Sequence, residues 1–510
     1  MDTNDFQSYS DEQLWAHLRE AENEEKVDLL LELAGRSSSR GDNIEAASLA
    51  EQAASEAEKT MANCVVENAR YRQGLALWRE QRYDDSLAAF HLGVNSYQEP
   101  DSKLDLSKNQ WGIASSLYLK GEYAEAAEWA RISTESAVSE EAYSMAGLNK
   151  FLEAKSLYMD DRETEALEAC EVARGYRRIE KQLNEVAEID AYMAQIHAYL
   201  GNSHEAAGLL RNCLVLAEAT SSIDIKYYSY RLGNALIDLG SYEEARFHLE
   251  TARNLYQEDD DHSSLADCFY SLSLTYRGSS HLDTALELTR SAVSLWDALG
   301  SNSSYIKGLV RTAILLFSKD DFSGAIDVNK RIMDFIETPK DYSETESYGW
   351  ALLRMIDCYG VREQWDIALE LLESTDMFGQ DSQHQANNWF YSLKARALYA
   401  LERHEEAMGV ADTALAQTKN EEVDLSTAQL YEIRARVSLE QNRPDKERQI
   451  AHAIALLLAF GETSKARELS DYFKPDFSPR KSDNILVDEN PDYGDSGLDD
   501  RPPIFGFASN

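Results

Sequence analysis

The fold of this chain is decided by RLGNALIDLGSYEEARFHLETA, residues 231–252. Gly233 stands twelve residues before Ala245, Gly240 stands five before it, and Tyr242 stands three before it. Ala245 stands at a helix-packing position, where a small residue lets helices come close together.

The position of Ala245 recurs along most of the chain. The gaps between successive copies are 40, 40, 40, 40, 39, 40, 40, 43, 39 and 40 residues. A fixed period of this size indicates a stacked repeat array, in which no unit can bury its apolar face alone. The position is occupied by Ala46, Ser86, Ala126, Ala166, Ala206, Ala245, Ala285, Ala325, Ala368, Ala407 and Glu447.

Other residues of the pattern repeat in the same frame, for example Ala114, Gly121 and Tyr123 around Ala126. The unit resembles a tetratricopeptide repeat, and the resemblance covers roughly residues 24–460. It implies an all-α fold, a right-handed superhelical solenoid of about eleven helix pairs. The concave groove of such a solenoid holds another molecule.

The repeat is longer than the common tetratricopeptide repeat, which has 34 residues. Long repeats are similar to those of the Rap-type peptide receptors, the kinesin light chains and the mitotic-orientation adaptors, which hold peptides or protein segments in the groove. The proline that ends the family's repeat is missing from nearly every unit. We therefore expect the junctions between pairs to be longer and less sharp.

Both ends of the array carry a helical signal of their own. Ser10-Asp-Glu-Gln13 has the form of a capping box that starts a short helix. An amphipathic stretch from Thr463 fits a closing helix. The expected organisation is an N-terminal segment and capping helix over 1–23, the repeat solenoid over 24–460, a C-terminal capping helix over 461–474 and an acidic disordered tail over 475–510.

The tail differs from the array in composition. It holds five of the eight prolines, and eight acids against three bases give 8 − 3 = 5 net negative charges. Such a stretch cannot bury enough apolar surface to order itself. It nevertheless ends in an apolar cluster, which indicates either a docking motif or a frayed solubilising terminus. The candidate docking residues are Ile504, Phe505 and Phe507.

Composition and charge narrow the class of protein. The chain has only 8 Pro and 24 Gly in 510 residues, no apolar run long enough to span a bilayer, and no secretory signal. Five scattered cysteines without a CxxC pair favour a reducing, cytoplasmic setting. The net charge of −41 disfavours nucleic acid and anionic membranes as partners. Solvated helix faces explain this charge best, with a DNA mimic or a protein from a salt-loving cell as alternatives.

The resemblance also predicts which side chains line the groove. When each unit is numbered so that its repeated residue is the twentieth, the resemblance places the second, fifth, sixth, ninth and twelfth positions on the groove. The sixth position of several units is arginine, and the fifth and twelfth are often aromatic, among them Tyr118 and Tyr158, with Lys155 at a ninth. Arginine binds carboxylates and main-chain carbonyls, and aromatic faces take up apolar side chains. The alternative is that these aromatics are core and the arginines pair with neighbouring acids. The predicted groove residues are Arg72, Trp111, Tyr230, Arg231, Asn234, Tyr270, Arg277, Arg311, Arg354, Arg396 and Arg436.

The sequence holds none of the motifs that point to an enzyme. There is no phosphate-binding GxxxxGK[ST], no HExxH, no GxSxG and no cysteine with a histidine in a recognisable setting. We therefore expect no catalytic residues, no metal and no cofactor.

Three functions fit these observations. The first is a non-enzymatic scaffold or adaptor that binds an extended, acidic or mixed segment of another protein or peptide. The second is a regulatory sensor, in which a peptide or the chain's own tail occupies the groove. The third is an acidic mimic of a polyanion. The sequence leaves the partner and the oligomeric state open.

Overall fold

The computed structural model describes residues 6–60, 63–98, 102–222, 224–276, 281–337, 339, 342–375, 378, 387–417 and 424–471. Every regular element in these ranges is helical, so the predicted all-α solenoid of helix pairs is confirmed. The chain divides into two compact units, residues 1–260 and 261–510. The sequence does not announce this division, because the repeat period continues across it.

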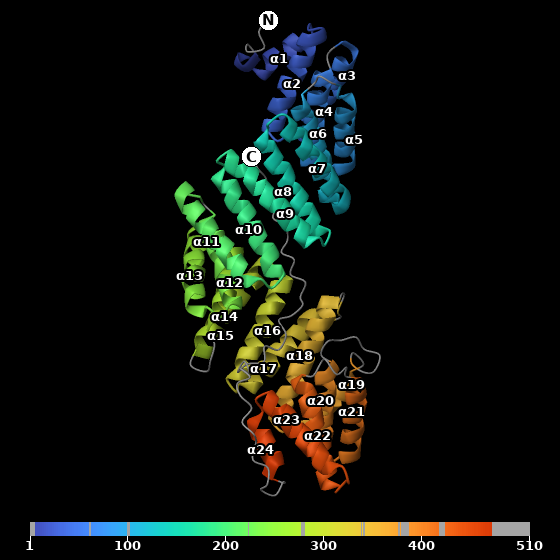
Figure 1. Cartoon of the computed structure of the whole chain (residues 1–510), viewed down its shortest axis with the longest axis vertical. Helices are drawn as coiled ribbons and strands as arrows, with labels where there is room; N and C mark the ends of the chain where they lie inside the picture. The colour runs from blue at the N-terminus through green and yellow to red at the C-terminus, as the bar shows by residue number, and fades with distance from the viewer. Residues whose placement is uncertain are drawn as a thin grey trace. The chain divides into compact units, whose positions relative to one another are not determined.

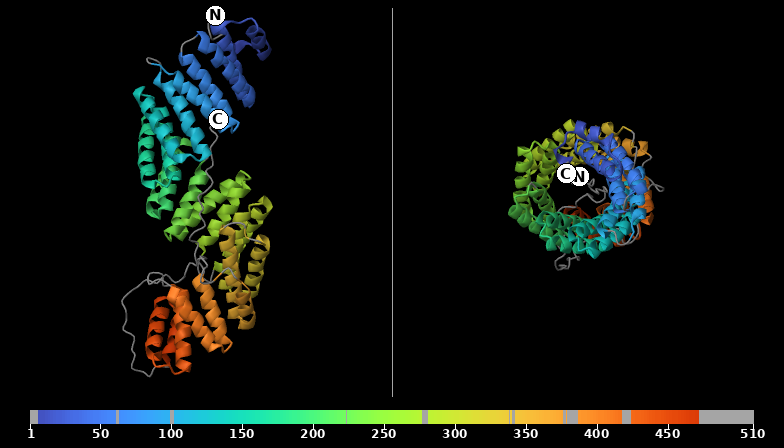
Figure 2. Two further views of the ribbon diagram at one scale, coloured as in Figure 1. Left: turned by 90° about the vertical axis from the view of Figure 1, so that its right-hand side faces the viewer. Right: turned by 90° about the horizontal axis from the view of Figure 1, so that it is seen from above.

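The first unit begins with a short 3-10 helix, η1 (Phe6–Ser8), followed by a succession of α-helices (Figure 1). Figure 2 shows the same succession from the side. The helices are α1 (Asp11–Leu18), α2 (Asn23–Ser39), α3 (Asn43–Thr60), α4 (Asn63–Arg79), α5 (Tyr83–Ser96), α6 (Lys103–Lys120), α7 (Tyr123–Ser139), α8 (Tyr143–Met159), α9 (Glu163–Ile179), α10 (Leu183–Tyr199), α11 (Ser203–Thr220), α12 (Ile225–Asp238) and α13 (Tyr242–Glu258).

The second unit continues the same alternation of helices. Its helices are α14 (His262–Thr275), α15 (Leu282–Leu299), α16 (Asn302–Ser318), α17 (Phe322–Ile336), α18 (Tyr342–Val361), α19 (Trp365–Ser374), α20 (Asn387–Ala400), α21 (His404–Gln417), α22 (Leu425–Glu440), α23 (Lys446–Ala459) and α24 (Thr463–Asp471).

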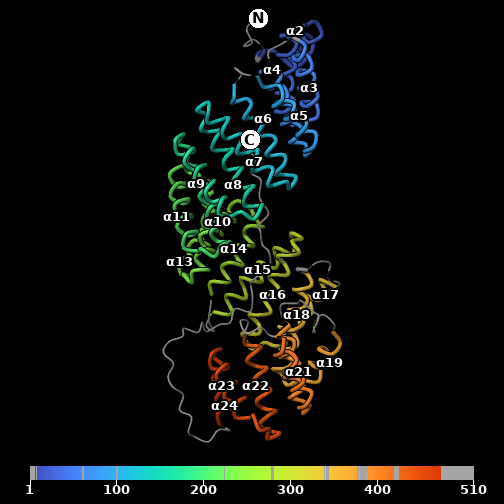
Figure 3. The backbone as a smooth tube through the Cα atoms, turned by 45° about the vertical axis from the view of Figure 1, so that its right-hand side comes forward, coloured from blue at the N-terminus to red at the C-terminus, as the bar shows by residue number. Residues whose placement is uncertain are grey.

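The even-numbered helices from α2 to α22 pack against the odd-numbered helices, and several of them also pack against one another. Each packs against the odd-numbered helix that follows it, and α4 also packs on α6, as α20 does on α22. Successive odd-numbered helices, such as α9, α11 and α13 in Figure 3, approach one another less closely. The rows therefore curve toward the even-numbered helices, which we call the inner helices. The inner face is the surface that they form.

The turns inside the pairs share one backbone conformation. The residue five places before each repeated small residue is left-handed wherever the structure describes it, as at Gly121 with φ +84° and Glu402 with φ +60°. Glycine adopts this conformation without a Cβ clash, whereas other residues pay for it. A second left-handed residue stands between pairs, for example Lys181 between α9 and α10.

This second turn corrects the expectation of long junctions at some places in the chain. Residues 140–142 join α7 to α8, and residues 180–182 join α9 to α10, whereas 97–102 separate α5 from α6, 375–386 separate α19 from α20 and 418–424 separate α21 from α22. A left-handed residue ends the helix as sharply as a proline would, because it turns the chain out of the helical path.

The repeated small residues lie where the two helices of a pair cross. Ala245 is fully buried, and a Cβ added to Gly233 on the facing helix would lie 2.5 Å from the Leu249 side chain. Ten of the eleven repeated positions are buried, and Ser86 adds a hydrogen bond of 2.9 Å from its hydroxyl to the Gly74 carbonyl. Glu447 is the exception and is exposed in the first turn of α23.

The predicted capping box at the N-terminus is present. The backbone N–H of Gln13 donates to the Ser10 hydroxyl at 3.3 Å, and the backbone N–H of Ser10 donates to the Gln13 side chain at 2.8 Å. Leu14 of this helix is fully buried against the first pair. Arg36 on α2 ties the segment down through the main-chain oxygens of Phe6 and Tyr9.

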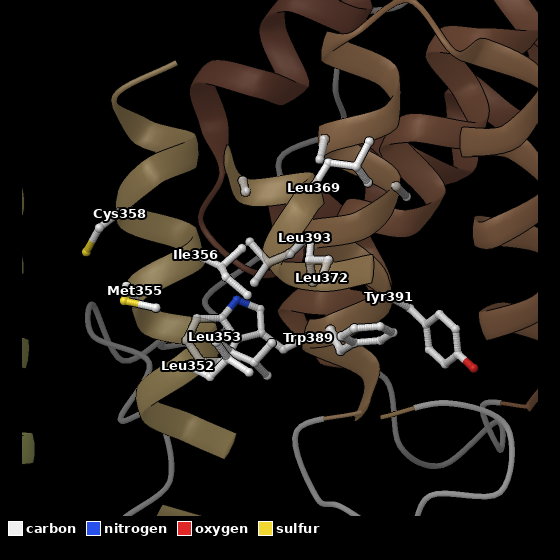
Figure 4. Packing of buried hydrophobic residues seen from close by; sticks show 14 of the residues in the cluster. Leu352, Leu353, Met355, Ile356, Cys358, Leu369, Leu372, Trp389, Tyr391 and Leu393 are labelled. Carbon is white, nitrogen blue, oxygen red and sulfur yellow. The ribbon is translucent and has the colours of Figure 1, made fainter. Parts of the chain in front are cut away.

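The cores of the two units are built differently. The largest core cluster lies in the second unit and joins helices α15 to α22. Figure 4 shows part of it, with Ile356 of α18 pointing toward Leu372 of α19 and Leu393 of α20. The first unit has several smaller clusters that are rich in alanine, such as the one around Ala50 and Ala53.

Candidate functional site

The predicted groove residues that the structure describes all lie on inner helices. Arg277, Ile504, Phe505 and Phe507 lie outside the described residues. The others can be sorted by what each side chain contacts, because a group that is already satisfied within the protein has less to offer a ligand.

Two of the predicted arginines lie in the first unit, and both donate only to neutral groups. Arg72 on α4 donates to the Asn68 side chain at 2.9 Å and to the Leu31 carbonyl of α2 at 3.1 Å. Arg231 on α12 contacts the Tyr227 hydroxyl at 3.2 Å and the Gln195 side chain of α10 at 3.5 Å. Among the described residues, no carboxylate lies within ion-pair distance of either guanidinium, so both positive charges stay uncompensated.

The predicted arginines of the second unit have a different set of partners. Arg396 on α20 forms an ion pair with Asp357 on α18 at 3.1 Å and lies over the Trp365 ring. Arg436 on α22 is bound between two acids, Glu432 at 2.8 Å and Glu468 at 2.9 Å.

Two further arginines of the second unit contact neutral groups among their partners. Arg311 donates to the Ser273 carbonyl at 3.3 Å, and Arg354 lies over the Trp350 ring at 5.8 Å. Arg72, Arg231 and Arg311 thus each connect consecutive inner helices by bonding to a group on the preceding inner helix. Arg396 and Arg436 have their charges compensated by named carboxylates.

The predicted aromatic residues fall into two groups. Trp111 and Tyr230 are half-buried on inner helices of the first unit, and the Trp111 ring lies 6.4 Å from the Trp78 ring. Tyr270 is buried in the core of the second unit, with its ring 5.6 Å from that of Trp296 on the outer helix α15. Tyr270 thus packs between helices.

Several polar groups on the inner helices of the first unit have no partner among the described residues. The Asn234 side chain on α12 is half-buried and makes no hydrogen bond with the described residues. The hydroxyls of Tyr118 on α6 and Tyr192 on α10 are shielded from solvent and also lack an acceptor. An unpaired buried polar group costs free energy, so these positions gain from a ligand that supplies the missing partner.

Lys155 on α8 adds a third uncompensated cation to the inner face. Its ammonium lies over the Phe151 ring, 4.7 Å from the centroid, and no carboxylate of the described residues pairs with it. Burial lowers the pKa of Lys155, while the nearby Glu188 carboxylate acts in the opposite direction. The Tyr192 ring meets the same Phe151 ring edge-on at 5.4 Å.

Sequence reasoning included Lys155 among the groove positions but missed Tyr192 and Glu188. Both stand on α10, at the sixth and second positions of their unit, which the pattern marks as groove-lining. Four other units carry an arginine at the sixth position, and these arginines were predicted to line the groove. The tyrosine at the same position could have been predicted to line it for the same reason.

Two kinds of feature are absent from the described residues. These residues contain no group of three or more His, Cys, Asp and Glu side chains placed to hold a metal ion. No helix among them combines the length and apolar character needed to cross a membrane.

Comparison with known protein families gives a match to one part of the chain. Residues 225–298 match the tetratricopeptide repeat family. No match is found among curated protein sequences.

Solved structures that align with parts of this chain share little sequence with it. The apo form of RapI is 12% identical with a TM-score of 0.43, covering 53% of this chain and 97% of RapI. The apo quorum sensor NprR from B. thuringiensis is 13% identical with a TM-score of 0.43, covering 70% and 97%. A putative kinesin light chain from Podosopora anserina is 16% identical with a TM-score of 0.34, covering 38% and 96%.

The repeated helix pairs and the buried small residues at their crossings agree with the match of residues 225–298 to the tetratricopeptide repeat family.

Proposed function

We propose that the protein is a non-enzymatic binding protein whose first unit holds an extended, acidic or mixed segment of another protein on its inner face. Tetratricopeptide repeats commonly bind protein or peptide segments. The observation that carries the proposal is the uncompensated positive charge of Arg72, Lys155 and Arg231 in a chain of net charge −41.

The chemistry of this face suits an extended main chain. Asn234 offers both an N–H donor and a C=O acceptor, which is what the backbone of an extended segment requires. The half-buried Trp111 and Tyr230 offer aromatic surface for apolar side chains. The arginines already hold neutral groups, so a carboxylate can replace a weak neutral acceptor with a charge-assisted hydrogen bond.

A selection from a library of displayed random peptides against the full chain tests the proposal. We expect a consensus peptide to be enriched and to bind in a saturable, salt-sensitive manner. Arg231→Glu and Asn234→Ala should each weaken binding by about ten-fold, because each removes a hydrogen-bonding group worth about 1.5 kcal/mol.

Two variants on the outer helices serve as matched controls. Arg253→Glu on α13 makes the same charge change, and Asn212→Ala on α11 removes the same side chain. Both should bind the peptide as the unmodified chain does. Enrichment of no peptide, or equal losses in the inner and outer variants, would refute the proposed function.

A further inference from the structure

The inner helices α6, α8 and α10 bring together a small group of side chains on the first unit. Lys155 and Phe151 come from α8, Tyr192 from α10 and Tyr118 from α6. Phe151 links the group, because the Lys155 ammonium lies on its face and the Tyr192 ring stands perpendicular to it at 89°.

We propose that Lys155, together with Tyr192, forms a subsite that recognises the carboxylate of an Asp or Glu side chain in the bound segment. This inference rests on the proposed function and adds the identity of one ligand side chain. The Lys155 side chain is half-buried, whereas the Tyr192 hydroxyl is shielded from solvent and makes no hydrogen bond with the described residues. A bound segment can therefore contact the exposed part of the lysine side chain.

The tyrosine hydroxyl is available to join the contact. It makes no hydrogen bond with the described residues, so turning it toward a bound oxygen breaks no existing hydrogen bond. Burial raises the pKa of Tyr192 above its ordinary value, so the hydroxyl keeps its proton and remains a donor. A carboxylate held by an ammonium and a phenol would have its charge neutralised and an oxygen hydrogen-bonded, as burial of an anion requires.

The single charge of the subsite favours a carboxylate over a phosphate. A phosphorylated side chain carries between one and two negative charges and is usually held by several arginines. Here one lysine supplies one positive charge. The Glu188 carboxylate on α10, which acts on this lysine, is exposed and would repel a doubly charged group more strongly than a carboxylate.

Substitution of Glu188 should change the binding of an acidic segment in the opposite direction to substitution of Lys155. Its carboxylate attracts the Lys155 ammonium without forming an ion pair among the described residues. Removing this charge should leave Lys155 free for the ligand alone. Glu188→Gln should therefore bind an acidic segment more tightly, while Lys155→Met should bind it more weakly.

The experiment sequences the peptides that the full-length chain and its variants enrich from the same displayed library. The unmodified chain should enrich peptides with Asp or Glu at one fixed position of the consensus. Lys155→Met should keep the rest of the consensus, lose that acidic preference and bind the original peptide about ten-fold more weakly, the value of one charge-assisted hydrogen bond. Tyr192→Phe should cause a smaller loss.

Lys394→Met is the matched control in the second unit. Its ammonium also lies over an aromatic ring, that of Phe390 at 5.7 Å, on the inner helix α20. This variant should leave the consensus unchanged. Thermal melting of each variant, followed by circular dichroism, confirms that the changes in binding are not changes in folding.

The outcomes separate this inference from the proposed function. A consensus that depends on Asn234 and Arg231 but lacks an acidic position, or keeps it in Lys155→Met, overturns the subsite and leaves the function standing. Stronger binding of a phosphoserine peptide than of its Glu counterpart overturns the assignment of a carboxylate. Enrichment of no peptide overturns both proposals.

Discussion

The inner faces of the two units use the same repeat frame and the same residue types in different ways. In the second unit, Arg396 and Arg436 are neutralised by carboxylates from neighbouring positions. In the first unit, Arg72 and Arg231 hold only neutral groups. A basic residue at a groove position is therefore a candidate for binding a ligand only when no carboxylate of the protein compensates its charge.

The units also differ in their turns and cores. The left-handed residue within each pair is glycine at four of six places in the first unit, namely 41, 121, 201 and 240. At the four described places in the second unit it is Asp320, Glu363, Glu402 or Asn442. The second unit accepts less favourable turns alongside its larger core cluster, whereas the first unit combines easier turns with smaller, alanine-rich clusters.

The largest expected effect is the loss of stability when alanine replaces a glycine that packs against an aromatic ring. This loss should depend on whether the ring can move. A Cβ on Gly112 would lie 2.5 Å from the fully buried Phe90 ring, and one on Gly360 would lie 2.6 Å from the half-buried Trp365 ring. Gly112→Ala should lower the free energy of unfolding by about 1–3 kcal/mol, since Phe90 has nowhere to move. Gly360→Ala should cost less, because Trp365 can shift toward solvent.

Denaturant titration of the full chain, with hydrogen exchange to follow each unit, measures both costs. If both substitutions lower the free energy of unfolding by the same amount, the side chains around the two glycines move equally easily.

The second prediction uses pH to titrate the inner face of the first unit. Burial lowers the pKa of Lys155 below its ordinary value of 10.5, so the ammonium loses its proton earlier than other lysines as pH rises. Binding of an acidic peptide should then weaken by about ten-fold above that pKa, when the charge-assisted hydrogen bond is lost. Fluorescence anisotropy at increasing pH measures this change.

The neighbours of Lys155 fix the sign of this effect. Glu188 remains charged and opposes the loss of the proton, while burial raises the pKa of the Cys170 thiol to about 12 and keeps it neutral. Lys155→Arg keeps its charge throughout and should remove the pH dependence. A pH dependence that survives in this variant must come from another group.

The third prediction concerns a substitution that gives Arg231 in the first unit the kind of acidic partner that Arg396 has in the second unit. Gln195→Glu would place a carboxylate beside Arg231, as Asp357 stands beside Arg396. The new ion pair should add about 0.5 kcal/mol to stability. It should also weaken peptide binding, because it compensates a charge that the ligand would use.

The reverse change is Asp357→Asn, which frees Arg396 in the second unit. It should lower stability slightly and leave peptide binding by the first unit unchanged. Calorimetric titration of both variants with one peptide compares them directly, and unchanged binding in Gln195→Glu would contradict a role for the Arg231 charge.

The smallest effect concerns the turns. Glu402 has a φ of +60°, which costs about 1–2 kcal/mol for a residue with a Cβ. Glycine removes this cost but loses about 0.5–1 kcal/mol of chain entropy on folding. Glu402→Gly should therefore raise the stability of the second unit by about 0.5 kcal/mol, and Gly201→Ala in the first unit should lower stability. A thermal melt that shows Glu402→Gly to be destabilising would show that the Glu402 side chain contributes to the turn.

Much of the fold was predictable because it depends on local spacing. Ala245, Gly233 and Gly240 define one pair, and their recurrence defines the others. The short junctions were not predicted, because Lys181 and Glu141 carry no sequence mark of their left-handed backbone. The division after Asp260 was also missed, since the period is unbroken there.

The candidate site was only partly predictable. The sequence placed Arg231 and Arg396 on inner helices, but their partners stand in the preceding repeat, 36 and 39 residues away. Whether that partner is Gln195 or Asp357 decides whether the charge is free. The repeat pattern says nothing about this choice, because it fixes positions and leaves the polar residues at them open.

The most direct test of the account is hydrogen exchange of the full chain with and without the selected peptide. We predict slower exchange on inner helices α8, α10 and α12 when the peptide is bound, with α18, α20 and α22 unchanged. Protection confined to the second unit, or to outer helices, would contradict the central claim that the uncompensated inner face of the first unit is the binding surface.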